Sequence, residues 1–255
     1  MTIDVATKEF YDSFWPKFVP IYEETKKYML ETIAERHVGR ALDAGCGHGI
    51  CSVVLSELAD EVTAVDISTD SLATARQQAK AFGRANITHH HQDLQTLDPA
   101  ISGFDLVWCW GVAMMAPDPI KVMHNLMNAT KPGGVVYLGL YLKTWLSPVH
   151  EAVRHFCRTF MNGPRRKQLV CDFFTALTHV ACRLKGQEIN RRADNVSIQA
   201  QVEDWYYPPY KTFYSIEEIV ELFHRNGFEA ECIQDRLGRM KSATIFVVRA
   251  VKHGG

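Results

Sequence analysis

The chain has 255 residues, which suits one domain or one domain with a sizeable insertion. Hydrophobic residues make up 47% of it and charged residues 22%, so disordered and fibrous classes are excluded. The formal net charge of -1 disfavours a protein that binds nucleic acid by bulk charge.

The cysteines and the apolar runs bear on location. The seven cysteines are scattered and include no Cys-x-x-Cys pair, which favours reduced thiols of a cytoplasmic protein. The N-terminal residues lack the apolar stretch of a signal peptide. The longest apolar run, 133–142, is shorter than the roughly 20 residues that cross a bilayer. We therefore expect a cytoplasmic protein without a membrane span.

Residues 1–37 are predicted to form an N-terminal helical arm. Phe10, Phe14 and Phe18 recur at helical spacing within 4–35, with interruptions at Pro16 and Pro20. The arm either packs on the core as an ordinary amphipathic helix or covers a ligand pocket.

A cluster of glycines follows the first predicted strand, 41–43. The order is Asp43, Gly45, Gly47 and Gly49, and an apolar helix opens at Ile50. Glycine lets the backbone turn tightly and approach a ligand, and the helix N-terminus beyond it favours negative charge. The pattern predicts a site for a small ligand with a carboxylate or nucleotide part, at the carboxyl edge of a parallel sheet.

A second acidic residue ends the β-branched strand 61–66. Asp66 lies 23 positions after Asp43, and its carboxylate could accept two hydrogen bonds from a ribose diol. The alternative is an ordinary turn acid, because Ser68 and Asp70 follow it and could cap the helix 71–82.

These motifs together resemble those of the class I S-adenosylmethionine (SAM) dependent methyltransferases of the small-molecule type. The glycine motif, Asp66, Asp93 after the strand 86–91, and the turn Lys131-Pro132-Gly133-Gly134 occur in that family's order. The resemblance implies an α/β fold with a doubly wound, mostly parallel, seven-stranded sheet and an inserted helical lid. Residues 38–142 would form the SAM-binding core, and 208–255 would complete it.

The resemblance also implies roles for individual residues. Asp66 would bind the ribose of SAM, and Asp93 the adenine amino group. Trp110, at the end of the fourth strand 104–112, would contact the methionine part, and Tyr11 belongs to an aromatic N-terminal segment with Phe14 and Trp15. The full predicted set of cofactor-binding residues is Asp43, Gly45, Cys46, Gly47, Asp66, Ile67, Asp93, Leu94, Trp110 and Tyr11.

Two further features have ordinary structural interpretations. Met114 and Met115 stand where many relatives of the family have histidines, and core packing is favoured for both. Alternate side chains of a strand point to opposite faces, so His89 and His91 would share one face and His90 would lie on the other. No Cys, Asp or Glu at a metal-ligand spacing accompanies them. We therefore predict no metal site.

Residues 143–207 are too long for an ordinary connection and are predicted to be an inserted helical lid on the acceptor side. Apolar spacing predicts helices over 148–161 and 166–184. From 143 to 192 there are ten Lys or Arg residues against three acids, a net charge of +7. This charge either marks a solvated helical face or favours anionic acceptors. Weak candidates for a catalytic base are His150, His155, His179 and Tyr207.

The last part of the chain has clear boundary signals. Ser215 and Glu218 form a capping-box pattern, and Gly227 suits the end of the helix that follows. The strands 229–236 and 242–251 should form an antiparallel pair around Gly238.

The resemblance implies direct in-line transfer of a methyl group from SAM to a small-molecule acceptor, for which anionic and aromatic compounds are the leading classes. S-adenosylhomocysteine (SAH) would be the product. The alternatives are an RNA methyltransferase, suggested by the basic insertion, a SAM-binding protein without turnover, and a SAM-fold enzyme with other chemistry. The balanced total charge counts against RNA.

Overall fold

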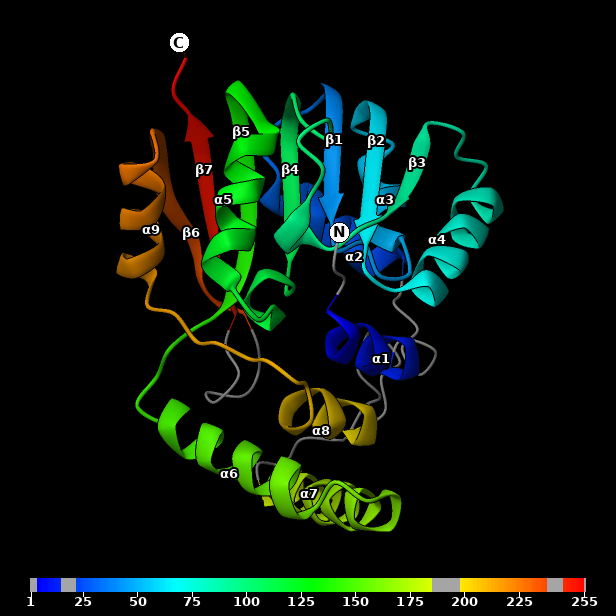
Figure 1. The fold of residues 1–255 in the computed structure, drawn as a ribbon, viewed down its shortest axis with the longest axis vertical. Coiled ribbons are helices and arrows are strands. Elements are labelled where there is room, and N and C mark those ends of the chain that lie inside the picture. The colour runs from blue at the N-terminus through cyan, green and yellow to red at the C-terminus, as the bar shows by residue number, and fades with distance from the viewer. Residues whose placement is uncertain (1–3, 15–21, 185–197, 238–244, 255) are drawn as a thin grey trace.

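The computed structural model describes residues 4–14, 22–184, 198–237 and 245–254. Within them lies a seven-stranded sheet in the order β3-β2-β1-β4-β5-β7-β6 (Figure 1). The strands are β1 (Val38–Ala44), β2 (Ala59–Asp66), β3 (Ile87–His91), β4 (Phe104–Trp110), β5 (Thr130–Tyr141), β6 (Phe228–Leu237) and β7 (Ile245–Lys252).

The direction of the strands confirms the predicted fold class. The pairs from β3 through β5 are parallel, whereas β7 runs antiparallel to both β5 and β6. The predicted pair of final strands is therefore present, although Gly238 lies outside the described residues.

Helices cover both faces of the sheet, as expected for parallel strands that are apolar along their length. One face carries α2 (Tyr22–Thr32), α3 (Ile50–Leu55) and α4 (Thr69–Ala81), and the other carries α5 (Pro119–Ala129) and α9 (Ile216–Arg225). Strand β5 shows the alternation directly: Val135 and Tyr137 pack toward α2 and α3, while Val136 and Leu138 pack toward α5 and α9.

Several residues predicted to cap or end helices do so in the structure. Ser68 caps α4, and Ser215 with Glu218 forms a capping box at the start of α9. Gly227 has a φ of 79°, the left-handed conformation that ends a helix. Met114 and Met115 lie in the short 3-10 helix η3 (Ala113–Met115) and are buried in the core, which confirms their packing role.

Four further helices lie beyond the edge at which β1 and β2 end (Figure 1). They are α1 (Val5–Phe14), α6 (Ser147–Phe160), α7 (Pro164–Leu184) and α8 (Ile198–Tyr206). The sequence predicted α6 and α7 to within a few residues but not α8. We call α6, α7 and α8 the lid; the proposed domain boundaries at 37, 142 and 207 stay predictions.

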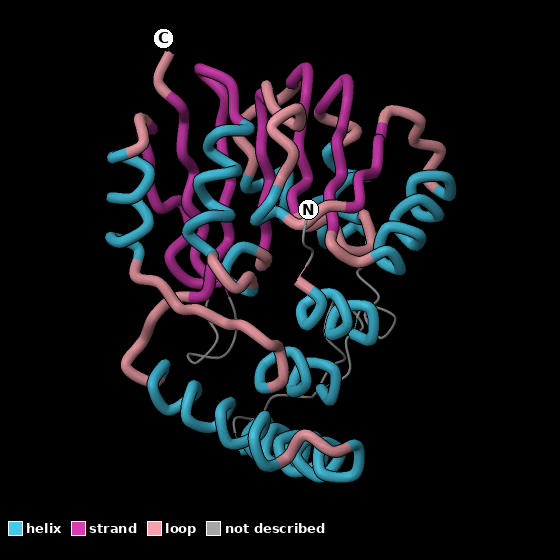
Figure 2. Tube along the Cα trace, in the orientation of Figure 1, coloured by secondary structure: helices cyan, strands magenta, loops and turns pink. Residues whose placement is uncertain are grey.

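The lid has its own small apolar core. Cys157 of α6, Val170 and Cys171 of α7, and Val202 and Tyr206 of α8 are buried together. Figure 2 shows that the segment from α8 to α9 is a loop that passes between the lid and the sheet. The lid therefore covers the carboxyl edge of the parallel strands, where ligands bind in open α/β sheets.

Candidate cofactor and acceptor site

The glycine loop connects β1 to α3 at this carboxyl edge. Gly45, Gly47 and Gly49 all have positive φ, at 83°, 51° and 80°. A Cβ on Gly45 would lie 2.4 Å from a methyl of Val112, and one on Gly49 would lie 2.9 Å from Cα of Ala75. The loop therefore requires glycine for conformation and for space, and it leaves bare backbone at the edge.

Asp66 holds this loop against the end of β2. Its carboxylate accepts hydrogen bonds from the backbone N–H of Gly47 and of Ser68, both at 2.8 Å. Burial raises the pKa of the Asp66 carboxyl, while these two hydrogen bonds favour its ionised form. Since each carboxylate oxygen has two lone pairs, Asp66 can accept two more hydrogen bonds from a diol.

Asp43 lies beneath the loop and is buried. It accepts a hydrogen bond of 2.5 Å from Ser52 Oγ of α3. Burial raises the pKa of Asp43 to about 7; the hydrogen bond from Ser52 opposes the rise and the charge of Asp66 adds to it. This contact gives Asp43 a role in joining β1 to α3, and its predicted contact with the cofactor stays a prediction.

The raised pKa of Asp43 predicts a dependence of stability on pH. The folded protein keeps this proton up to a pH of about 7, whereas an unfolded aspartate loses it near pH 4. Stability from this group is therefore full below about pH 4 and falls as the pH rises to about 7. Asp43→Asn, which can still accept from Ser52, should reduce that fall in urea unfolding curves. An unchanged slope would contradict the assignment.

Asp93 lies at the end of β3 under the N-terminal helix. It caps η2 (Leu94–Thr96) by accepting from the backbone N–H of Gln95 at 2.8 Å, and it accepts from that of Asp4 at 3.3 Å. The Ser68 hydroxyl also donates to Asp12 of α1. Helix α1 and the residue before it thus contact the residues that follow β2 and β3; the role of the arm as a cover stays a prediction.

Tyr11 connects the two halves of the site. Burial raises the pKa of its hydroxyl, and the negative charges of Asp204 and then Asp66 raise it further. Tyr11 packs against the sheet core, while the adjacent Phe10 packs against the lid core. The side chain of Phe14 and all of Trp15 lie outside the described residues.

The other predicted cofactor residues lie around the same edge. The Cys46 side chain is buried among Ala64, Leu72 and Ala75, so only its backbone can face a ligand. The Ile67 carbonyl lies 2.9 Å from Nε2 of His91.

Leu94 is buried, and its carbonyl accepts from the side-chain amide of Asn125 at 2.7 Å. Trp110 stacks on Trp108 with ring centroids 5.6 Å apart and meets Tyr28 at 5.1 Å, on the face of the sheet that α2 covers. Ligand contacts of Cys46, Ile67, Leu94 and Trp110 stay predictions.

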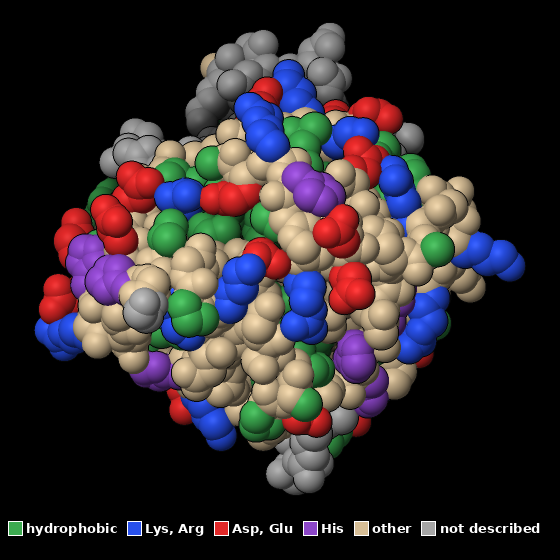
Figure 3. Space-filling model, turned by 90° about the horizontal axis from the view of Figure 1, so that it is seen from above, with side chains coloured by type: hydrophobic (Ala, Val, Ile, Leu, Met, Phe, Trp, Pro, Cys, Tyr) green, Lys and Arg blue, Asp and Glu red, His purple; other side chains and the backbone are tan. Residues whose placement is uncertain are grey.

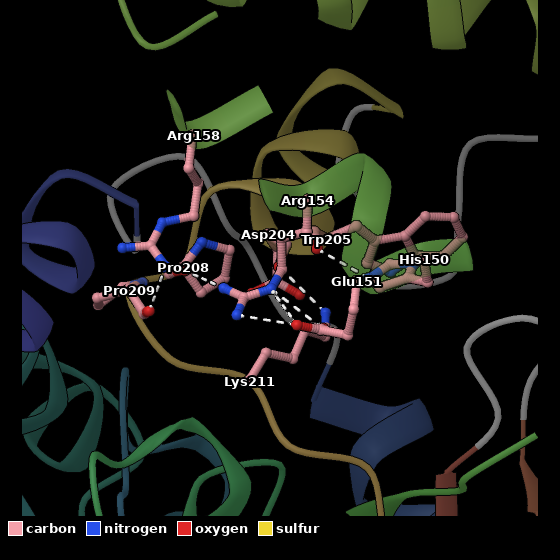
Figure 4. Close-up of polar contacts among 9 residues, drawn as sticks. All are labelled: His150, Glu151, Arg154, Arg158, Asp204, Trp205, Pro208, Pro209 and Lys211. Atoms are coloured by element: carbon pink, nitrogen blue, oxygen red, sulfur yellow. Dashed lines mark hydrogen bonds and ion pairs between the residues drawn. The ribbon is translucent and has the colours of Figure 1, made fainter. Parts of the chain in front are cut away.

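A polar cluster joins the lid to the loop that follows α8 (Figure 4). Arg154 of α6 pairs with Glu151, with Nε 3.1 Å from a carboxylate oxygen, and donates to the carbonyl of Pro208 at 2.8 Å. Arg158, one turn further along α6, donates to the carbonyl of Pro209 at 2.6 Å. These contacts hold 208–209 against the lid and position the residues after them.

Lys211, which the sequence analysis did not single out, is buried in this loop. Its Nζ donates to the backbone carbonyl of Asp204 at 3.3 Å and lies 4.3 Å from the ring centre of Tyr141, at the end of β5. Burial lowers its pKa to about 8, although the charge of Asp204 opposes the change. The available signal was a single lysine within the aromatic run Tyr206–Tyr214.

The four candidate bases lie in different environments: two are buried and two are exposed. His150 is packed between Tyr206 and Phe213, with Nε2 3.2 Å from the carbonyl of Trp205, and burial lowers its pKa to about 4. The Tyr207 hydroxyl donates to the carbonyl of Met161 at 3.2 Å. His155 and His179 are exposed on α6 and α7. A catalytic role stays a prediction for all four.

No group of three or more His, Cys, Asp or Glu side chains among the described residues is arranged to hold a metal ion. No helix in the described ranges combines the length and apolarity needed to cross a bilayer.

Comparisons with known proteins agree with this geometry. Residues 41–134, from the end of β1 to the start of β5, match the family model of a methyltransferase domain. Residues 41–134 therefore form a methyltransferase domain. This finding confirms the family predicted from the order of the glycine motif, Asp66, Asp93 and Lys131–Gly134.

The domain has relatives of similar sequence. The chain is 35% identical over 111 residues to a ubiquinone biosynthesis O-methyltransferase of Idiomarina loihiensis, covering 42% of this chain and 45% of that protein. It is 34% identical over 206 residues to the uncharacterized protein syc1184_c of Synechococcus sp., covering 77% of this chain and 49% of that one. This chain thus spans about half the length of these relatives.

Solved structures share the fold. The N-methyltransferase NodS from Bradyrhizobium japonicum, in complex with SAH, superposes with a TM-score of 0.59 over 97% of this chain and 98% of that one. At 14% identity this similarity concerns the fold alone.

Proposed function

We propose that this protein transfers a methyl group from SAM to a small-molecule acceptor held between the carboxyl edge of the sheet and the lid. The observation that carries the proposal is the position of Tyr11. Tyr11 packs against the sheet core and the adjacent Phe10 packs against the lid core, while burial and then the charges of Asp204 and Asp66 raise the pKa of Tyr11. The N-terminal helix therefore contacts both the sheet and the lid, which supports an acceptor site between them.

The residues at this edge fit SAM. Asp66 has acceptor capacity for the ribose diol beyond its two backbone hydrogen bonds, and the positive φ of Gly45 and Gly47 lets the loop turn tightly at this edge. Asp93, which follows β3, is the proposed acceptor for the adenine amino group. When bound, SAM supplies an electrophilic methyl on its sulfonium. The protein then has to align the acceptor and exclude water.

The acceptor side points to a compound with an acidic or phenolic oxygen. Lys211 and Tyr141 present a cation beside an aromatic ring, which suits a ring that carries a hydroxyl or carboxylate group. At neutral pH Lys211 is mainly protonated and can stabilise the oxyanion that attacks the methyl; its neutral fraction can take the proton from the hydroxyl. The relative that is named an O-methyltransferase supports oxygen as the methylated atom.

Replacing Lys211 with methionine should raise KM for the acceptor by about tenfold or more, because a hydrogen bond to a charged group contributes about 1.5 kcal/mol or more. The affinity for SAH should change little. The matched control is Lys121→Met, an exposed lysine on α5. An equal loss of SAH affinity in Lys211→Met would show a structural role instead.

Product formation tests the proposed reaction directly. The protein is incubated with SAM and a panel of hydroxylated and carboxylated aromatic compounds, and SAH and methylated product are measured together. Stoichiometric formation of both supports the proposal. SAH binding without any turnover would favour a SAM-binding protein, and turnover only with RNA, weakening steeply with salt, would favour an RNA methyltransferase.

A further inference from the structure

The outer surface of the lid carries an unusual concentration of exposed apolar side chains. Of the twelve large apolar side chains exposed among the described residues, nine lie between 145 and 184. These nine, which we call the outer stripe, are Trp145, Val149, Phe156, Phe160, Leu169, Phe173, Leu177, Val180 and Leu184. Trp145 and Leu184 are 84% and 83% exposed.

The stripe follows the helical repeat. On α7, Leu169, Phe173, Leu177, Val180 and Leu184 are separated by three or four residues, so they share one face. On α6, Val149, Phe156 and Phe160 are separated by seven and four residues and also share one face, and the centroids of the two phenylalanine rings are 5.4 Å apart. Other side chains of both helices, Cys157, Val170 and Cys171, already pack in the lid core. The stripe is therefore a second apolar face that the lid itself does not bury.

Most of the exposed charged residues in this segment are basic. Lys143, Arg165, Arg166 and Arg183 are exposed. Between 143 and 184 the one exposed acid is Asp172, which accepts from Gln168 at 2.8 Å; Glu151 is half-buried and paired with Arg154. By contrast, the face of the molecule opposite the lid mixes acidic and basic side chains (Figure 3).

We propose that the outer stripe docks the protein on an anionic lipid surface. Helices with an exposed apolar face rich in Phe, Trp and Leu, flanked by Lys and Arg, lie in the plane of a membrane with the apolar face inserted. Each basic residue near such a surface adds about 1 kcal/mol of attraction. In this orientation the lid lies on the membrane and the sheet points away from it.

A second copy of the chain fits the stripe less well. A symmetric dimer would place the same patch of both subunits in contact. The basic residues that flank the stripe would then face each other and repel. A lipid surface supplies the complementary charge and the apolar interior together.

The test is flotation of the full chain with vesicles of phosphatidylcholine, with and without phosphatidylglycerol, in the absence of SAM. Wild-type protein should bind the anionic vesicles more tightly and should lose binding as salt rises. Phe173→Glu with Leu177→Glu should weaken binding by about tenfold or more, because apolar contact is lost and charge is added. Ile120→Glu, which also changes an exposed apolar residue but on α5, should bind like wild type.

Three outcomes would overturn the proposal: no binding to anionic vesicles, equal binding to neutral ones, or a dimer in sedimentation that the double variant dissociates. Circular dichroism and SAH titration of the double variant separate unfolding from loss of docking. If it unfolds, Arg165→Glu with Arg183→Glu, both at exposed positions, supplies the second variant and should weaken anionic binding alone. Vesicle binding and SAM binding are measured in separate experiments. A negative result for lipid docking therefore does not contradict the proposed methyl transfer, and a negative result for SAM binding does not contradict lipid docking.

Discussion

Asp66→Ala is expected to weaken SAH binding by about 100-fold or more. The ribose diol would lose two hydrogen bonds to an ionised carboxylate, each worth about 1.5 kcal/mol, and each 1.4 kcal/mol corresponds to a factor of about ten. The variant also leaves the N–H groups of Gly47 and Ser68 without the carboxylate that now accepts from them. Isothermal titration with SAH measures the loss.

The control for this experiment is Asp70→Ala. Asp70 lies four residues away in the first turn of α4, is exposed, and carries the same charge. Its replacement should leave SAH affinity within about twofold, since surface substitutions usually change free energies by less than about 0.5 kcal/mol. Equal binding by wild type and Asp66→Ala would contradict the ribose assignment.

Gly49→Ala is expected to destabilise the fold by about 3 kcal/mol and to reduce SAH binding. A non-glycine residue in the left-handed conformation costs about 1–2 kcal/mol. The new Cβ would also meet Cα of Ala75 at 2.9 Å, and overpacking of this kind costs about 1–3 kcal/mol more. Urea unfolding gives the loss of stability.

Gly83→Ala separates the two causes. Gly83 follows α4 with a φ of 65°, and a Cβ there would meet nothing within 4 Å. This variant should lose only the conformational part, about 1–2 kcal/mol, and keep its SAH affinity. If both variants lost equal stability, the close approach of the glycine loop to α4 would make no measurable contribution to the free energy of unfolding.

The core of the fold could be predicted because its signals are local. A strand, an acid and glycines at fixed spacing specify the β1–α3 turn, and Asp66 lies where the spacing placed it. The caps at Ser68 and Ser215 depend on residues within one helical turn. The order of these motifs along the chain then determined the topology.

The lid side could be predicted only in part because its contacts are distant in sequence. Lys211 acquires its environment from Asp204 and from Tyr141, which is 70 positions away in the chain. The excess of basic residues in 143–192 was visible, but its arrangement around an apolar face depends on which side of α6 and α7 the small lid core buries. No spacing rule for single helices specifies that side.

Titration of the wild-type protein with SAH tests the central claim most directly. The account predicts saturable binding of one SAH per chain, lost in Asp66→Ala and retained in Asp70→Ala. Absence of saturable binding to the folded wild-type protein would contradict the assignment of the glycine loop, Asp66 and Asp93 as a SAM site.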